Sequence, residues 1–152
     1  MTTALIHATC LAAAGRGVLI RGPSGSGKSD LALRCIANAP SALIPASAML
    51  VADDQVFVET AFDGLIAIAP GAIRGLLEIR GVGIVKVPHA DRVDLHLIAD
   101  LVAASDTIDR LPDPALEASI LGVSLPLIRI NPFDASAHIK LLSALLLDTA
   151  QH

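Results

Sequence analysis

The chain has 152 residues, a length that suits one domain with a buried core, and we expect residues 1–152 to form it. Hydrophobic residues make up 53% of the chain but aromatic residues only 2%, which favours the aliphatic core of an α/β domain with buried strands. The net charge of −4, without any run of basic residues, argues against nucleic acid as a main partner.

Neither a membrane span nor a signal peptide is expected. No apolar stretch reaches the roughly 20 residues that cross a bilayer, and no basic region precedes the first apolar residues. We therefore expect a cytoplasmic protein, in which Cys10 and Cys35 are reduced thiols within the core.

The first two thirds of the chain are predicted to be mainly strands. A glycine-rich loop interrupts them and leads into an apolar helix that should end before Pro40. A turn at Phe62-Asp63-Gly64 should join two strands in a hairpin. In chain order, we expect strands at 4–12, 17–21, 48–54, 55–60, 64–70, 82–87 and 92–101.

The last third is predicted to contain two helices separated by a strand. The segment 113–122 has Asp113 in an N-cap position and Gly122 after its end, which indicates a short helix. A strand at 125–131 should follow, and apolar residues at helical spacing predict a final helix from Asp134 onward. Strands that come in runs rather than in strict alternation with helices predict an α/β fold with a mixed sheet.

The stretch GPSGSGKS matches the phosphate-binding pattern G-x-x-x-x-G-K-[ST] in full. Its glycines allow backbone N–H groups to surround a phosphate, while the lysine contacts the β- and γ-phosphates and the last hydroxyl binds Mg²⁺. A glycine-rich turn with an incidental lysine is the structural alternative. The nucleotide-binding residues are then Gly22, Pro23, Ser24, Gly25, Ser26, Gly27, Lys28 and Ser29.

Asp53 and Asp54 follow directly after a predicted buried strand. They could simply open a turn, because aspartate is a common turn residue. Beside a phosphate-binding loop, however, a carboxylate at a strand end can hold Mg²⁺ or accept the proton of an attacking hydroxyl. Adjacent strand residues point to opposite sides, so we expect one carboxylate to face the γ-phosphate and the other to support the loop or the metal.

Three stretches together resemble a known family. GVLIRGPSGSGKS, LVADDQV and LLEIRGVGIVKV are similar, in order and spacing, to the catalytic domain of HPr kinase/phosphorylase. That family phosphorylates a serine of the phosphocarrier protein HPr, in control of carbon metabolism, and also removes the phosphate. The resemblance covers essentially the whole chain and implies a P-loop domain of the phosphoenolpyruvate-carboxykinase-like type. It also implies the short, catalytic-domain-only form and a homo-oligomer, namely a hexamer.

The resemblance implies roles for individual residues. ATP would bind the loop, with Lys28 on its phosphates and with Ser29 and Glu78 as Mg²⁺ ligands. Asp53 would be the base for phosphorylation and the acid for the reverse reaction.

His7 and Arg110 match a histidine and an arginine of the same family. From the residues alone, His7 could be an ordinary core or edge residue and Arg110 a solvated side chain. Glu78 and Arg80 could form a surface ion pair of little energetic weight.

Other functions stay open on the residues alone. The family's PVRPGR stretch, which is linked to dephosphorylation, has no clear counterpart in LPLIRINPFDAS, so kinase chemistry is better supported than phosphorolysis. A small-molecule kinase would usually carry an arginine-rich lid, which the chain lacks. A nucleotide-sensing module without transferase activity is the third alternative. The other histidines show no ligand spacing, so no zinc site is expected; they are His89, His96, His138 and His152.

Overall fold

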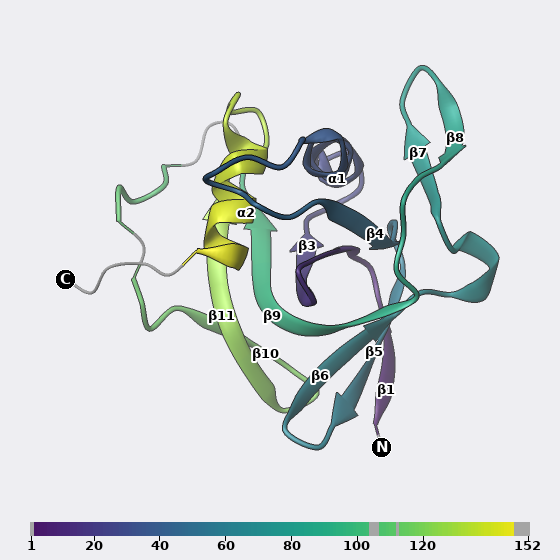
Figure 1. Cartoon of the computed structure of the whole chain (residues 1–152). Helices are drawn as coiled ribbons and strands as arrows, with labels where there is room; N and C mark the ends of the chain where they lie inside the picture. Colours follow the sequence, from purple (N-terminus) through teal and green to yellow (C-terminus); the bar gives the residue numbers. More distant parts are fainter. Residues whose placement is uncertain (1, 104–106, 112, 148–152) are drawn as a thin grey trace.

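A curled, nine-stranded mixed sheet carries two α-helices on one face (Figure 1). The structure is a computed structural model that describes residues 2–103, 107–111 and 113–147. The strands of this sheet are β1 (Thr3–Ile6), β2 (Thr9–Ala13), β3 (Arg16–Arg21), β4 (Ala48–Ala52), β5 (Val56–Ala61), β6 (Gly64–Ile68), β9 (Arg92–Leu101), β10 (Glu117–Ile120) and β11 (Val123–Ile130). The remaining elements are the two-stranded hairpin β7 (Leu76–Ile79) and β8 (Gly83–Lys86), the 3-10 helix η1 (Gly71–Ile73), and the helices α1 (Lys28–Ala37) and α2 (Ala137–Leu146).

Four strands end at the same edge of the sheet. The strand order is β1-β5-β6-β9-β3-β2-β4. β11 pairs with the last residues of β9, on the side of β9 that faces away from β3. β3, β9 and β11 are parallel, and β4 runs in their direction because both β3 and β4 are antiparallel to β2. The carboxyl ends of open α/β sheets are the usual place for ligands, and here they carry the glycine-rich loop, Asp53 and the segments 101–103 and 131–133.

The core has two parts, one on each face of the sheet. In β3, Val18 and Ile20 face a cluster that includes Leu31 of α1 and Leu141 of α2, so the helices cover this face. Leu19 faces the opposite cluster, which the curled sheet closes with residues of β5, β6, β10 and β11. This alternation of buried residues on both faces explains the continuous aliphatic run of the strand.

The predicted strand at 4–12 is two strands. The chain bends at His7 and Ala8, where the N–H of Ala8 donates to the carbonyl of Ile6. β1 pairs with β5, whereas β2 pairs with β3 and β4. The bend therefore lets one apolar segment serve two parts of the curled sheet.

The predicted helix at 113–122 is wrong. The carboxylate of Asp113 accepts the N–H of Ala115 at 2.9 Å in a turn, and β10 then pairs antiparallel with β11. Leu121 and Gly122 join these strands and both have positive φ, 51° and 82°, as in a two-residue hairpin turn. Aspartate and glycine fit a turn as well as a helix cap, and pairing with β11 decides between them.

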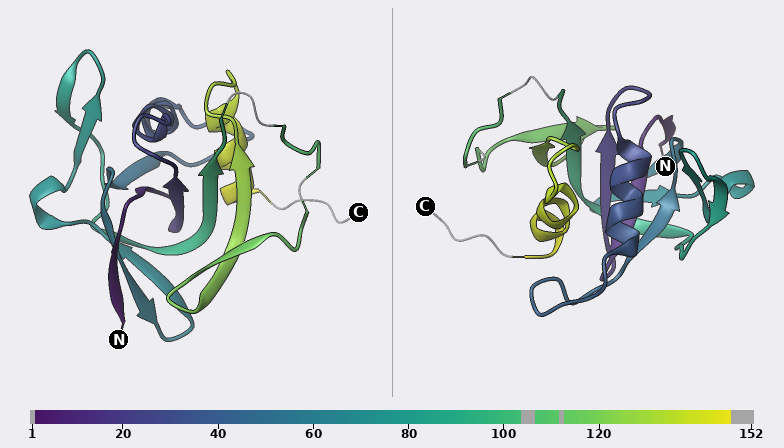
Figure 2. Two further views of the ribbon diagram at one scale, coloured as in Figure 1. Left: turned by 180° about the vertical axis from the view of Figure 1, so that it is seen from behind. Right: turned by 90° about the horizontal axis from the view of Figure 1, so that it is seen from above.

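The β5–β6 hairpin is confirmed, with its turn at Phe62 and Asp63. The predicted strand at 82–87 is the second strand of the β7–β8 hairpin, which projects from the body of the molecule (Figures 1 and 2). Within the described residues, neither helix has the length and hydropathy needed to cross a membrane.

Candidate active site

The glycine-rich loop leaves β3 and ends in the first turn of α1, as the motif predicts. Gly25 and Gly27 have φ of 79° and 103°, in the left-handed region that glycine adopts without strain. The loop folds around Lys28, whose buried ammonium donates to the carbonyls of Gly22 and Pro23 at 2.8 and 3.1 Å. An ammonium has three N–H donors, so one stays available beyond these two contacts.

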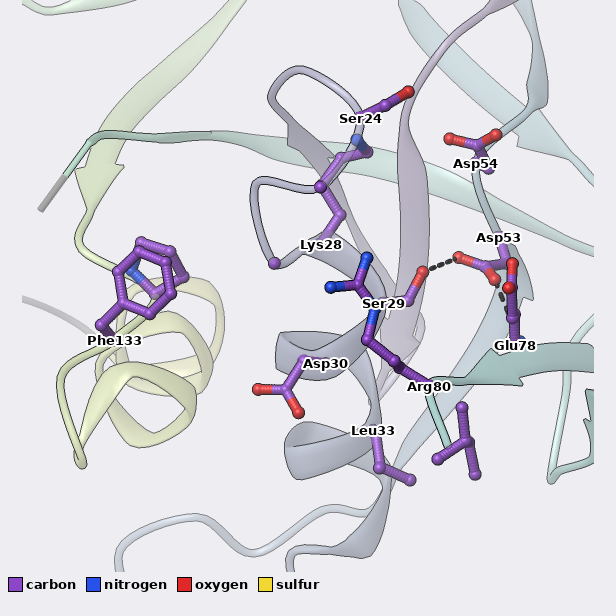
Figure 3. Close-up of a pocket in the computed structure, with 14 residues that line it drawn as sticks. Ser24, Lys28, Ser29, Asp30, Leu33, Asp53, Asp54, Glu78, Arg80 and Phe133 are labelled. Atoms are coloured by element: carbon purple, nitrogen blue, oxygen red, sulfur yellow. Dashed lines mark hydrogen bonds between the residues drawn. The ribbon is translucent and has the colours of Figure 1, made fainter. Parts of the chain in front are cut away.

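Asp53 connects this loop to two other elements. Its Oδ1 accepts the hydroxyl of Ser29 at 2.7 Å and that of Thr9 at 3.2 Å. Its Oδ2 accepts the backbone N–H of Glu78 at 3.2 Å (Figure 3). The carboxylate is thus held by α1, β2 and β7 at once, next to the last residue of the glycine-rich loop.

Asp54 has a separate environment. It has a positive φ of 69°, and its N–H donates to the hydroxyl of Thr9 at 3.2 Å. Its carboxylate pairs with Nε2 of His7 at the bend between β1 and β2. The two adjacent carboxylates therefore have different partners, while Thr9 contacts both residues.

A cleft of about 460 Å³ lies over these groups. The glycine-rich loop, both aspartates, the β7–β8 hairpin and the segment after β11 all contribute to its wall. Figure 3 shows Glu78 beside Asp53, and Arg80 extending from the hairpin toward the loop. Arg80 lies in the turn that follows β7, and Ile79 beside it lines the cleft as well. Its place two residues after the predicted metal ligand Glu78 is a signal from which Arg80 could have been expected in the site rather than in a surface ion pair.

The structure brings most of the predicted site residues together. The loop, Asp53 and Glu78 line one cleft, and His7 reaches it through Asp54. Arg110 lies elsewhere: it is exposed within the segment 107–111 and does not line this cleft. Contributors that were missed from the sequence include Thr9, Arg80 and Phe133. The places of Thr9 and Phe133 depend on how distant strands pair.

The oxygen atoms around Ser29 suit a magnesium ion. Mg²⁺ in phosphoryl-transfer sites binds one or two carboxylates together with substrate phosphates. The hydroxyl of Ser29 and the carboxylate of Asp53 are in contact, and the exposed Glu78 lines the same cleft. These residues fit the ion that the sequence predicts.

An ion pair lies at the end of β3, directly before the glycine-rich loop. Arg21 at the end of β3 donates two hydrogen bonds to Asp100 of β9, at 2.7 and 3.0 Å. The hydrogen bond to Asp100 raises the pKa of the Arg21 guanidinium above its ordinary value. This paired charge joins the two parallel strands at the edge that carries the loop.

Comparison with known proteins identifies relatives along most of the chain. The family described as HPr Serine kinase C-terminal domain matches residues 1–150. HPr kinase/phosphorylase of Streptococcus equi subsp. zooepidemicus is 36% identical over 135 residues, which are 82% of this chain and 41% of that relative. The same-named protein of Malacoplasma penetrans is 31% identical over 139 residues, or 84% of this chain and 44% of the relative.

A solved structure supports the same relationship. It is described as "Structure of the Hpr(Ser) kinase/phosphatase from Coxiella burnetii", has a TM-score of 0.73 and 26% sequence identity, and matches over 92% of both chains. The chain spans less than half the length of the curated relatives that it matches. With a family match over residues 1–150 and the same fold, the chain belongs to the HPr serine kinase C-terminal domain family.

Proposed function

We propose that this protein is a cytoplasmic kinase that transfers the γ-phosphoryl group of ATP to a serine of an HPr-like phosphocarrier protein. One contact carries the proposal: the 2.7 Å hydrogen bond between Ser29, at the end of a complete phosphate loop, and Asp53. It puts a carboxylate beside the place where the terminal phosphate of a bound nucleotide would lie. The names of the relatives support the protein substrate. Residues 1–152 act in this proposal as one catalytic domain of a homo-oligomer, a hexamer by family resemblance.

The loop and its lysine bind and orient the phosphates. Backbone N–H groups of the loop and the first turn of α1 surround the β-phosphate. The Lys28 ammonium donates its remaining N–H to an oxygen of the β- or γ-phosphate, and its positive charge attracts both phosphates. Ser29 and Glu78 would hold Mg²⁺, which neutralises part of the phosphate charge when bound. Arg80 adds a positive charge from the opposite wall of the cleft.

Asp53 is the proposed proton acceptor. As the serine oxygen of the partner attacks the γ-phosphorus, its proton passes to the Asp53 carboxylate. The bond between the γ-phosphorus and the β-phosphate oxygen breaks, and ADP leaves. In dephosphorylation, inorganic phosphate would attack the phosphorus of the phosphoserine, and the bond between that phosphorus and the serine oxygen would break. The protonated Asp53 would give its proton to the serine oxygen, and pyrophosphate would leave. Thr9 and the His7–Asp54 pair keep Asp53 and its strand end in place.

The test follows the labelled γ-phosphate of ATP. We expect the purified protein to label a serine of a purified HPr-like protein, and Asp53→Asn to retain ATP binding while losing at least about 100-fold in transfer rate, the lower end of a general base's contribution. Transfer by Asp53→Asn at the wild-type rate would remove Asp53 from the base role. Label on a metabolite instead would indicate a small-molecule kinase. ATP binding without any transfer would indicate a nucleotide-sensing module.

A further inference from the structure

A second, smaller hollow borders the glycine-rich loop and shares Ser24, Gly25 and Phe133 with the first cleft. It measures about 240 Å³, and its walls are the loop itself, the segment after β9 and Phe133. Leu101, Val102 and Phe133 make much of its lining apolar. The Ser26 hydroxyl is buried within the loop against Gly22 and has no hydrogen-bond partner within the described residues. The hollow thus combines an apolar wall with the backbone of the glycine-rich loop.

Phe133 has an exposed side chain on a backbone segment that is held by several contacts. Its side chain is 69% exposed, although its backbone N–H donates to the side-chain oxygen of Asn131 at 3.0 Å. The guanidinium of Arg34 donates to the carbonyl of Pro132. Pro132 in turn packs close to Gly27, where an added Cβ would lie 3.3 Å from the proline ring. The ring is therefore accessible to a ligand at the loop and does not pack in the core.

The sheet order gives a bound nucleotide a direction. β4, which ends directly before Asp53, lies on one side of β3, while β9 and β11 lie on the other. Figure 3 shows the loop between Asp53 and Phe133. When the γ-phosphate faces Asp53, the α-phosphate and the nucleoside leave the loop on the side of Phe133.

We propose that the hollow beside Phe133 is the nucleoside site and that the base of the nucleotide stacks on the Phe133 ring. This proposal rests on the proposed function, because it concerns the same bound nucleotide. Leu101 and Val102 contact the nucleoside from the side of β9. The phosphates thus supply the binding energy at the loop, and stacking supplies the preference for a nucleotide over a bare polyphosphate.

Calorimetric titration with two ligands tests the stacking. Mg·ATP carries phosphates and base, whereas Mg·tripolyphosphate carries phosphates alone. We expect Phe133→Ala to weaken ATP binding about 5- to 150-fold, the range for a lost base–aromatic stack, and to change tripolyphosphate binding by less than about twofold. Phe133→Trp should keep tight ATP binding, because a ring is retained.

Two control variants separate the possible outcomes. Phe62→Ala removes another exposed phenylalanine, at the β5–β6 turn, and should change neither affinity. Lys28→Ala should weaken both ligands. The stacking proposal is wrong if Phe133→Ala binds ATP as tightly as the wild type does, or if the wild type binds the two ligands equally well. In either case, weakened binding of both ligands by Lys28→Ala would still support the nucleotide site. If the wild type binds neither ligand, both proposals fall.

Discussion

Asp53 and Asp54 are neighbours whose carboxylates have different partners. Asp53 receives three hydrogen bonds from three elements, so its carboxylate cannot turn without breaking several of them. Asp54 pairs with His7, and both side chains are about half exposed. The left-handed backbone of Asp54 is a conformation that aspartate and asparagine tolerate. The carboxylate of Asp54 can therefore be neutralised by asparagine without disturbing the bend that carries Asp53.

The His7–Asp54 pair is predicted to act as one unit. Asp54→Asn and His7→Gln should each lower the phosphoryl-transfer rate about 10-fold, since a lost hydrogen bond to a charged group costs about 1.5 kcal/mol at the lower end, as suits a half-exposed pair. The double variant should be no slower than either single variant, because each change removes the same contact. Initial rates with labelled ATP measure this.

A matched surface pair is the control for these variants. Asp91→Asn breaks the exposed pair between Arg74 and Asp91, away from the cleft, and should leave the rate unchanged. Multiplicative losses in the His7–Asp54 double variant would show that the two residues act separately.

Among the elements, the β7–β8 hairpin contacts both the hydrophobic core and the candidate site. Leu77 is buried in the helix-side core, and the next residue, Glu78, donates its N–H to Asp53. At the other end of the hairpin, Val82 and Ile84 are exposed. The base of the hairpin is therefore fixed at the cleft wall while its tip extends into solvent (Figure 2).

Arg80 on this hairpin is predicted to stabilise the charge of the transferring phosphoryl group. Arg80→Ala should lower the transfer rate about 100-fold, comparable to loss of one donor to a developing negative charge, and should leave the melting temperature almost unchanged because the side chain is exposed. Lys86→Ala is the control: it removes a positive charge from the same hairpin outside the cleft. Equal effects of the two variants would reduce the role of Arg80 to general electrostatics.

How well an element could be predicted depends on where its stabilising contacts come from. The β3–loop–α1 unit and the β5–β6 hairpin follow from local signals, since glycines and turn residues specify the backbone within a few positions. Segment 113–122 carries equally clear local signals, but they suit two structures. Its antiparallel partner begins at Val123, and this pairing makes it a strand.

At the scale of the molecule, each of the two core clusters contains one buried thiol. Cys35 lies in the cluster under the helices and Cys10 in the cluster on the opposite face, and both are fully buried. Burial raises the pKa of the Cys35 thiol to about 12, against a lowering effect of Arg34. Burial also raises the pKa of Cys10 well above its ordinary range. The free, buried state of both cysteines confirms the predicted core thiols.

Both thiols should therefore resist Ellman's reagent at pH 8 in the folded protein. In urea they should become reactive over one and the same transition, because the sheet that carries both clusters must unfold to expose either. Above pH 9 the unfolded chain loses thiol protons that the folded chain retains, so the free energy of unfolding should fall, by up to about 1.4 kcal/mol per pH unit for each thiol. Reaction of one thiol well before the other would show that the two halves open independently.

The glycine-rich loop, the strand before it and the helix after it were determined by the sequence alone, because glycine conformations, one lysine and an apolar periodicity act within about 20 neighbouring residues. The tertiary structure decided which distant groups meet at that loop. Thr9, Arg80 and Phe133 reach it, and Arg110 lies outside it, because strand order and direction set which chain ends share an edge of the sheet. Such long-range pairings arise from the packing of the whole core, and no short stretch of sequence contains them.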